Sequence, residues 1–280
     1  MAKWPLLEER AELTSAHFAG RICGDFVKRL DFSIGCDIII LSWKTDRERE
    51  NMTRKKYYMV LDTETTSNAK TVFDIAYTIV DRQGNIVEQS NYLVKEIIDN
   101  PFLRGILQRD KFSACKYKNF YQELYKNKGL VKSFLDIRRN IRRAIRKYNC
   151  TVIAYNVNFD FTALNDMAKD LGKKSFFTKE TPIWDLWNIA LYTLCDSANY
   201  TKFCDKHGFV NERGNRQTTA ESVYRYVTKN TSFEEAHTAL ADTEIEAEIL
   251  LACLKRHKKM HTEIVGAVYR HPVWKKRCKK

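Results

Sequence analysis

The clearest hydrophobic pattern in the chain is a short apolar run, Tyr58 to Leu61, that ends abruptly in acidic residues. A run of this length and composition predicts a buried β-strand that ends at Asp62. Glu64 follows two residues later, and strand side chains alternate between the two faces, so Asp62 and Glu64 are expected to point the same way. Two adjacent carboxylates at the edge of a core repel each other and resist desolvation. A divalent cation is the usual compensation, so the pattern predicts a metal site.

Two further β-rich runs follow this strand and are joined by a short turn. The runs cover residues 72–80 and 86–94, and the turn between them contains Gly84 where a positive φ is wanted. Neighbouring strands joined by a tight turn must be antiparallel. The sequence therefore predicts an antiparallel meander, followed by helical pieces and loops over residues 97–128, with Pro101 and Gly105 as breaks.

Apolar residues at helical spacing predict an amphipathic helix over residues 130–148. Its other face is strongly basic and carries Arg138, Arg139, Arg142, Arg143, Arg146 and Lys147. A solvated face is the ordinary explanation for such a charge run, and contact with phosphate groups is the alternative. The phosphate contacts are expected from Arg139, Arg142, Arg143 and Arg146.

The rest of the pattern alternates strands and helices. A buried strand is expected over residues 150–155, a helix over 160–171, and an edge strand over 181–185 because Pro182 cannot donate to a ladder. Further helices are expected over 186–194, 200–206, 219–228 and 238–258, with an irregular loop over 208–218. A meander followed by a β–helix unit and then helices predicts an α/β fold with a mixed sheet flanked by helices.

Charge divides the chain into a central domain and two ends. The domain is expected over residues 57–256, with an N-terminal appendage of unknown role over 1–56 and a basic C-terminal tail over 257–280. From residue 255 to the end there are ten Lys or Arg residues against the single acid Glu263. The formal net charge is +13. Such a charge suggests a polyanionic partner, most often nucleic acid, although a basic protein at a membrane surface would look similar.

Several function classes are disfavoured by what the sequence lacks. No apolar stretch approaches the roughly 20 residues of a spanning helix, and the acidic N-terminus does not look like a secretory signal, so we expect a cytoplasmic protein with no membrane partner. The eight cysteines are scattered, which indicates reduced thiols. Cys253, His257 and His261 would share one helical face, but no fourth ligand is evident, so a helix surface is preferred to a zinc site.

Two further groups of polar residues fall where strands end or helices begin. The segment from Asn156 to Asp160 follows a predicted strand, which places Asp160 at the carboxyl edge of the sheet, where open α/β sheets bind ligands. His237 precedes the last long helix and Asp242 lies in its early turns, so both can face one cleft. Each residue alone has an ordinary explanation, such as a helix N-terminal acid or a surface histidine. Their conjunction with Asp62 and Glu64 favours a functional site.

These three segments, Asp62 to Thr65, Asn156 to Asp160 and His237 to Asp242, resemble the motifs of the DEDDh 3′–5′ exonuclease family, which is DnaQ-like and has the ribonuclease H-like fold. The resemblance covers roughly residues 56–255. There is one departure: many members carry His before the Asn of the second motif, and this chain has Tyr155 there. That position is not one of the five signature residues.

The resemblance implies a mechanism and a set of catalytic residues. Two Mg²⁺ or Mn²⁺ ions would lie about 4 Å apart and neutralise charge on the phosphoryl group and the leaving oxygen. Their oxygen ligands would be Asp62, Glu64, Asp160 and Asp242, with Asp62 bridging both ions. His237 would be the base that deprotonates the attacking water. The products would be 5′-mononucleotides released from a 3′ end.

Substrate contacts are expected from residues next to these motifs. They are Thr63, Thr65, Thr66 and Asn156 for the terminal nucleotide, and Phe159 and Trp184, with Trp187 and Tyr192 as further aromatic candidates, for base stacking. Core packing is the alternative for most of the aromatic residues.

We therefore expect a metal-dependent 3′–5′ exonuclease that acts on single-stranded or frayed DNA 3′ ends, since the basic helix and tail suit a long polyanion. An exoribonuclease is the alternative, because nothing in the sequence reads a 2′-hydroxyl. A nucleic-acid-binding adaptor that keeps the exonuclease fold is a further alternative. The sequence also leaves open that one of the two ends docks a polymerase or another replication or repair protein.

Overall fold

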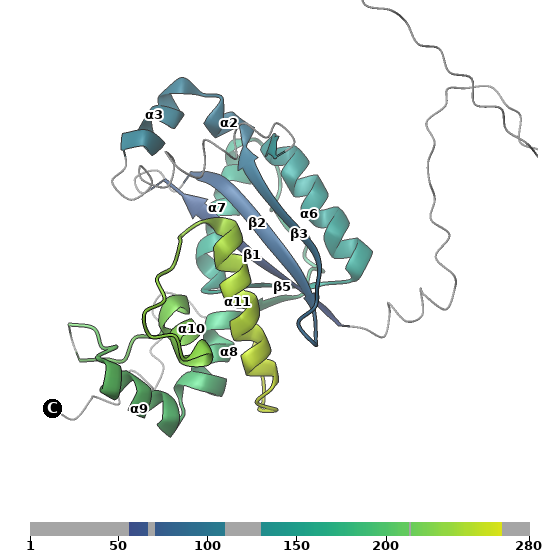
Figure 1. Ribbon diagram of the computed structural model, residues 1–280. Helices are drawn as coiled ribbons and strands as arrows, with labels where there is room; N and C mark the ends of the chain where they lie inside the picture. The colour runs from purple at the N-terminus through teal and green to yellow at the C-terminus, as the bar shows by residue number, and fades with distance from the viewer. Residues whose placement is uncertain (1–55, 67–70, 110–129, 213, 265–280) are drawn as a thin grey trace, which may run out of the picture. The chain divides into compact units, whose positions relative to one another are not determined.

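The computed structural model describes residues 56–66, 71–109, 130–212 and 214–264, although not the side chains of 106–109 (Figure 1). The predicted appendage, apart from residue 56, and most of the predicted basic tail lie outside these ranges. The described strands are β1 (Tyr57–Thr65), β2 (Val72–Asp81), β3 (Ile86–Val94), β4 (Val131–Lys132), β5 (Thr151–Ala154) and β6 (Ile183–Asp185). They form one six-stranded sheet in the order β4-β3-β2-β1-β5-β6.

The sheet is mixed, as the sequence predicted. β1 and β2 pair antiparallel, and so do β2 and β3, which confirms the predicted meander. On the other side of β1, β5 pairs parallel to β1, and β6 pairs parallel to β5 at the edge. The short β4 pairs parallel to β3. An antiparallel meander beside parallel strands, flanked by helices, is the ribonuclease H-like arrangement that the resemblance implied.

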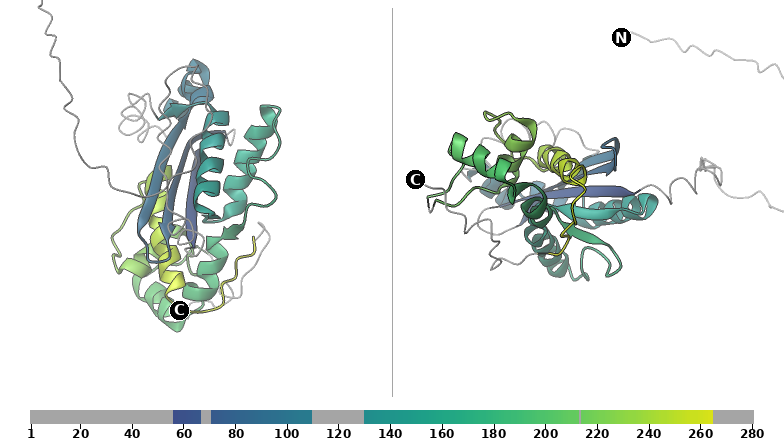
Figure 2. Two further views of the ribbon diagram at one scale, coloured as in Figure 1. Left: turned by 90° about the vertical axis from the view of Figure 1, so that its right-hand side faces the viewer. Right: turned by 90° about the horizontal axis from the view of Figure 1, so that it is seen from below.

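Helices cover both faces of the sheet (Figures 1 and 2). The helices are α2 (Lys95–Ile98), α3 (Pro101–Arg109), α6 (Phe134–Tyr148), α7 (Val157–Asp170), α8 (Leu186–Ala190), α9 (Ala198–His207), α10 (Ala220–Thr228) and α11 (Ala239–Leu254), with a π-helical segment η2 (Leu191–Cys195). α6 and α7 pack on one face. α8 to α11, together with η2, form the layer on the other face. None of these helices is long and apolar enough to cross a membrane, among the residues described.

The alternation of side chains along β1 assigns each residue to one of the two layers. Tyr57, Met59 and Leu61 belong to the core cluster under α6 and α7, whereas Tyr58 and Val60 belong to the cluster under α8 to α11. Both faces of β1 are therefore buried before the strand reaches its acidic residues. β2, which pairs with β1, is buried along all 10 of its residues.

The turn between β2 and β3 confirms the expected positive φ at Gly84, which is +96°. The carboxylate of Asp81 accepts hydrogen bonds from the backbone N–H groups of Gln83 and Asn85, which closes the turn. Glycine is also required for packing, because a Cβ atom at Gly84 would lie 2.5 Å from Cδ1 of Leu251 on α11.

Several boundaries differ from the predicted ones. β1 continues past Asp62 to Thr65, so both acids lie within a paired strand. The helix predicted from residue 130 is wrong in its first residues: Val131 belongs to β4, and α6 begins at Phe134. The reason is Ser133, whose hydroxyl accepts from the backbone N–H of Asp136 as the N-cap of α6.

Other helices begin or end at residues that differ from the predicted ones. α7 begins at Val157 instead of residue 160, so Asp160 lies within its first turns. α11 ends at Leu254, four residues before the predicted end. Pro101 is the first residue of α3 and not a break. A backbone N–H at the first helical position has no partner within the helix, so a proline there removes no hydrogen bond.

Candidate metal and catalytic site

Asp62, Glu64 and Asp242 form one group of carboxylates. One oxygen from each lies within 4.8 Å of the others, although α11 is separated from β1 by about 180 residues of chain. Asp62 and Glu64 share the β1 face that is covered by α11, as the period of two predicts. Among the described residues, this is the group of His, Cys, Asp or Glu side chains that could hold a metal ion.

Two contacts with β2 hold α11 in the register that brings Asp242 to this group. The buried carboxylate of Asp74 accepts a hydrogen bond from the backbone N–H of Ala239 at 3.3 Å, which satisfies a free donor at the helix N-terminus. One residue beyond Asp242, the hydroxyl of Thr243 lies 2.7 Å from the hydroxyl of Thr78 on β2. The position of Asp242 is therefore set by the sheet as well as by the helix.

Asp160 reaches the site from the other layer. Its Oδ1 accepts two hydrogen bonds from Thr63, one from the backbone N–H at 3.1 Å and one from the hydroxyl at 2.7 Å. Thr63 lies between Asp62 and Glu64 and points to the opposite face of β1, toward α7. Substrate contact by Thr63 stays a prediction, and the structure gives its hydroxyl this contact within the protein.

The carboxylates perturb one another. The pKa of Asp62 is raised well above its usual value, first by burial and then by the negative charges of Asp160, Glu246, Asp242 and Glu64. Burial raises the pKa of Asp160 to about 7, although the hydrogen bonds from Thr63 act in the opposite direction. These shifts show that burial and mutual repulsion oppose the ionisation of Asp62, and that burial opposes the ionisation of Asp160.

Glu246 is a member of this acidic group that the sequence analysis missed. It is 3 % exposed, and its pKa is raised by burial and by the charges of Asp160 and Asp242. Its Oε2 accepts a hydrogen bond from the backbone N–H of Tyr155, at 3.2 Å, just beyond the end of β5. The available signal was its spacing, because residues four apart lie on the same helix face and Glu246 is four residues after Asp242.

The donor set fits a hard divalent cation. Mg²⁺ and Mn²⁺ prefer carboxylate oxygens, and Asp62, Glu64 and Asp242 offer three within one cluster. A cation would also offset the repulsion that, together with burial, raises the pKa of Asp62. The identity and the number of ions stay predictions.

His237 lies in the segment that leads into α11, at the same end of the sheet. Ala239, two residues later, is bound to Asp74, and Asp74 is the β2 partner of Glu64 in the ladder. The imidazole is partly exposed, with 41 % of the side chain accessible, and its Nδ1 lies 3.5 Å from Oε2 of Glu235. A water molecule can therefore reach the imidazole.

Two of the predicted substrate contacts are accessible next to Asp160. Asn156 is the residue before α7, has a φ of +62° and lines a pocket of about 280 Å³ together with Tyr155 and Trp187. Phe159 is 43 % exposed although it is aromatic and adjacent to Asp160. Both side chains are therefore available for a nucleotide, and their contacts with one stay predictions.

The other candidate contacts have partners within the protein. The ring of Trp184 packs 5.6 Å from that of Tyr58, and Tyr192 stacks on His261 at 3.9 Å. Thr66 is 2 % exposed, and its backbone N–H donates to the carbonyl of Thr71. Thr65 is half-buried at the end of β1.

The predicted phosphate-binding arginines lie on α6. Arg142 donates to the carbonyls of Phe176 and Ser175, and Arg139 pairs with Asp136. Arg143 and Arg146 are exposed. The last turn of α6 lies near the start of β1, since the rings of Tyr148 and Tyr57 are 5.4 Å apart, whereas the acids lie near the end of that strand. Phosphate contact at α6 stays a prediction. It would require a nucleic-acid strand that extends along the sheet from the acids to α6.

The histidines that follow α11 do not share a helical face with Cys253. Because α11 ends at Leu254, His257 and His261 lie beyond the helix, and their spacing from Cys253 does not place them on one helix face. Cys253 is fully buried in the core, and His261 stacks on Tyr192. The preference against zinc at these residues is consistent with this geometry.

Comparison with solved structures finds similarity to exonucleases. No protein-family model matches the chain, and no curated protein matches it. The chain is similar to a product-bound exonuclease I, at 17% identity and a TM-score of 0.46, over 72% of this chain and 43% of that one. It is also similar to E. coli exonuclease I in complex with a dA16 oligonucleotide, at 18% identity and a TM-score of 0.44, over 71% and 40%.

Exonuclease X in complex with 5′ overhanging duplex DNA is similar at 16% identity and a TM-score of 0.36, over 71% of this chain and 92% of that one. The chain spans less than half the length of the exonuclease I chains that it matches.

Proposed function

We propose that this protein is a metal-dependent 3′–5′ exonuclease. The observation that supports the proposal is the group formed by Asp62, Glu64 and Asp242, together with Asp160, which is bound to Thr63 and is close enough to Asp62 for its charge to raise the pKa of Asp62. These four acids are the ones that the motif resemblance selects, and they come from β1, α7 and α11. A structural role alone does not account for so many carboxylates at one end of a sheet, because their mutual repulsion opposes folding.

Two divalent cations would be held by Asp62, Glu64, Asp160 and Asp242 and would neutralise the charge that develops on the phosphoryl group and on the leaving oxygen. Thr63 would keep Asp160 in position through its two hydrogen bonds. Glu246 is anchored to the backbone of Tyr155 and would add negative charge next to Asp160. That charge would favour cation binding over the empty state.

His237 would act as the general base. It is the imidazole in the segment next to the acids, and histidine accepts and releases protons near neutral pH. Its partial exposure lets water reach the ring. The imidazole would take one proton from the attacking water and release it later to solvent.

The proposed substrate is the 3′ end of single-stranded or frayed DNA, with RNA as the alternative. Phe159, which is exposed beside Asp160, would stack on a terminal base, and Asn156 would contact the same nucleotide. Asn156 directly precedes α7, and Phe159 and Asp160 lie in its first turns, so these three residues are close in the chain. Partner proteins and a cytoplasmic location are also proposed on the sequence alone.

The test is a digestion panel of matched DNA and RNA oligomers, single- and double-stranded, with Mg²⁺. We expect a 3′-end label to be lost at once and a 3′-phosphate to slow the reaction. Asp62→Ala should abolish cleavage. Asp166→Ala is the matched control, because Asp166 is an exposed carboxylate on α7 away from the cluster, and it should keep full activity.

Two results would contradict the proposal. Laddering that starts only from the 5′ end would exclude the 3′–5′ direction. Binding of oligomers in EDTA with unchanged affinity, together with no turnover by any divalent metal, would favour the adaptor alternative.

A further inference from the structure

His237 has a backbone conformation that needs support. Its φ is +52°, in the left-handed region, which costs a non-glycine residue about 1–2 kcal/mol. It lies in the connection between α10 and α11, which begins at Lys229, another residue with a positive φ. Because 41 % of the His237 side chain is exposed, packing alone does not fix the ring. Its orientation depends on a few specific contacts.

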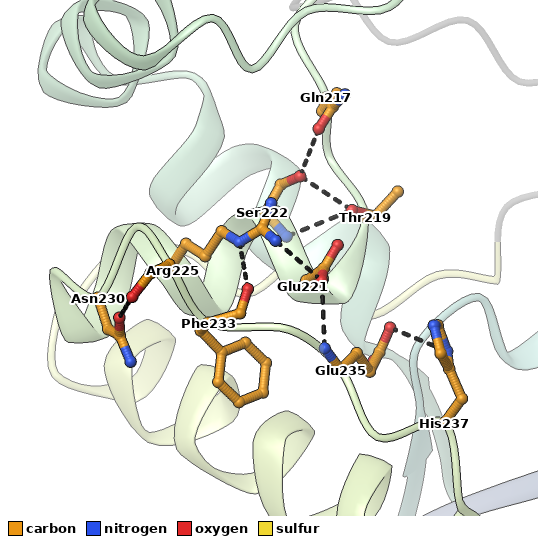
Figure 3. Close-up of polar contacts among 10 residues, drawn as sticks. Gln217, Thr219, Glu221, Ser222, Arg225, Asn230, Phe233, Glu235 and His237 are labelled. Carbon is orange, nitrogen blue, oxygen red and sulfur yellow. Dashed lines mark hydrogen bonds and ion pairs between the residues drawn. The ribbon is translucent and has the colours of Figure 1, made fainter. Parts of the chain in front are cut away.

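The ring contacts the carboxylate of Glu235. Oε2 of Glu235 lies 3.5 Å from Nδ1 of His237, and Figure 3 shows the carboxylate directed at the ring. Only 15 % of the Glu235 side chain is exposed, so the carboxylate is largely removed from water. A carboxylate that faces Nδ1 favours the tautomer with its hydrogen on Nδ1 and leaves Nε2 as the acceptor.

Glu235 is itself held by α10. Its backbone N–H donates to Oε1 of Glu221 at 3.1 Å, and the same oxygen accepts from Nη2 of Arg225 at 3.0 Å. Arg225 also donates through Nε to the carbonyl of Phe233 at 2.7 Å. Two backbone groups of the connecting segment, at Phe233 and Glu235, are therefore bound to one face of one helix (Figure 3).

The other end of the segment is held by the sheet. The backbone N–H of Ala239 donates to the buried carboxylate of Asp74, which pairs with Glu64 in the ladder of β1 and β2. His237 thus lies between an anchor on α10, at Glu235, and an anchor on β2, at Ala239. The segment between the two anchors is short, so the contact of Glu235 with the ring is built into the fold.

We propose that Glu235 is a positioning residue for His237, which holds the imidazole through Nδ1 so that Nε2 accepts the proton of the attacking water. This inference rests on the proposed function, because it assigns a role within that same site. Water gives one proton to Nε2 while its oxygen forms the bond to phosphorus. The bond to the 3′-oxygen breaks, and that oxygen keeps the electron pair and takes a proton from solvent. Nδ1 keeps its hydrogen, and the carboxylate of Glu235 offsets the charge of the imidazolium.

The charged groups around Glu235 come from two helices and from its own segment. Glu221 and Arg225 approach from α10, and Glu246 on α11 is close enough for the charge of Glu235 to raise the pKa of its carboxyl. His237 approaches from the same segment as Glu235. A change at Glu235 therefore alters the field at the acidic cluster, so the experiment must measure metal affinity separately from the ring.

The first measurement uses the metal-free protein and does not depend on activity. The variant is Glu235→Gln, which keeps the size of the side chain, and the matched control is Glu234→Gln, the same change at the exposed neighbouring residue. The ¹⁵N shifts of the His237 ring, at a pH where the imidazole is neutral, report which nitrogen carries the hydrogen. We expect the Nδ1–H tautomer to dominate in the wild type and in Glu234→Gln, and to lose its dominance in Glu235→Gln.

The second measurement is cleavage of a 3′-labelled oligomer at saturating Mg²⁺. Loss of a residue that orients a catalytic group typically costs 10- to 100-fold, so kcat of Glu235→Gln should fall by roughly that factor. KM and the Mg²⁺ concentration for half-maximal rate should stay within about twofold, which is under 0.5 kcal/mol. Glu235→Asp, which keeps the carboxylate, should retain more activity than Glu235→Gln.

Two outcomes would overturn the inference. One is a Glu235→Gln variant with the wild-type ring shifts and the wild-type kcat. The other is an equal loss in Glu234→Gln, since the effect would then not be specific to Glu235. A wild-type protein without nuclease activity would instead contradict the proposed function, and the ring shifts would still decide whether Glu235 sets the tautomer of His237.

Discussion

Asp160 makes the metal-free fold less stable at neutral pH, and removing its charge should reverse this. The carboxylate is buried among other acids, and no cation offsets its charge when metal is removed by a chelator. Asp160→Asn keeps the shape of the side chain and an Oδ1 acceptor for Thr63. We therefore expect the metal-free variant to be more stable than the metal-free wild type above pH 7, although the variant should lose nuclease activity.

The magnitude follows from the shift of the pKa of Asp160. The pKa rises from 3.8 to about 7, so the difference is 7 − 3.8 = 3.2, and at about 1.36 kcal/mol per pKa unit this is a ceiling of about 4 kcal/mol. The pKa of Asp160 is higher in the folded protein than in the unfolded protein. The contribution of the protonated Asp160 carboxyl to stability is therefore fully present below pH 3.8 and is lost as the pH rises through about 7. A neutral amide accepts a weaker hydrogen bond from Thr63, so the net gain expected at pH 8 is about 2 kcal/mol.

The assay is urea unfolding in EDTA at several pH values between 5 and 8, with thermal unfolding as a second probe. A gain of about 2 kcal/mol corresponds to a rise in Tm of about 4–8 °C for a domain of this size. The difference between variant and wild type should shrink as the pH falls toward 5. Added Mg²⁺ should stabilise the wild type more than the variant. A cation that binds only the folded state shifts the folding equilibrium, and the variant lacks one of the predicted metal ligands.

A clear result would refute this reasoning. If Asp160→Asn in EDTA at pH 8 is no more stable than the wild type, burial of the charged Asp160 carboxylate does not destabilise the metal-free fold. Asp166→Asn provides the reference, because Asp166 is exposed on the same helix and its replacement should change stability by less than about 0.5 kcal/mol.

Three further predictions concern neighbouring side chains. Thr63→Val removes a 2.7 Å hydrogen bond to Asp160, and a hydrogen bond to a charged group contributes about 1.5–3 kcal/mol. The single-turnover rate at limiting Mg²⁺ should therefore fall by at least 10-fold. An unchanged rate would show that this hydrogen bond does not position Asp160. Glu246→Gln removes a charge that raises the pKa of Asp62, so the variant should be more stable than the wild type in urea unfolding in EDTA at pH 8. Calorimetry should show weaker Mg²⁺ binding by the variant. Equal Mg²⁺ affinity would contradict the role given to Glu246. Phe159→Ala should leave Tm nearly unchanged, because the residue is 43 % exposed. It should raise KM for single-stranded oligomers by about 5-fold or more, since stacking of a base on an aromatic ring contributes about 1–3 kcal/mol. An unchanged KM would exclude Phe159 from the substrate contacts.

The elements set by local pattern were predictable from the sequence. Alternation along β1 placed Asp62 and Glu64 on one face, and the turn at Gly84 required a meander. Each of these inferences uses residues that are close in the chain. The α/β class and the mixed sheet followed from the order of such segments, and the structure confirms both.

The contacts that hold the site together were not predictable, because they depend on register between distant segments. Nothing near Thr63 shows that its hydroxyl binds a residue 97 positions later. The spacing of Glu246 from Asp242 places both on one face of α11, but the sequence does not show that Glu246 binds the backbone N–H of Tyr155. Glu235 is one of two adjacent glutamates, and only the path of the segment between α10 and α11 distinguishes it from Glu234.

The three residues Asp62, Thr63 and Glu64 connect the two helical layers through a single stretch of backbone. Two of these side chains meet α11 on one side, and the middle one secures α7 on the other. A deletion or insertion of one residue here would exchange the two sides, leaving a threonine among the acids and a carboxylate against the opposite core. Length variation in this protein should therefore be tolerated in its connections and excluded from this strand, and a library of single-residue indels scored for folding would reveal that boundary directly.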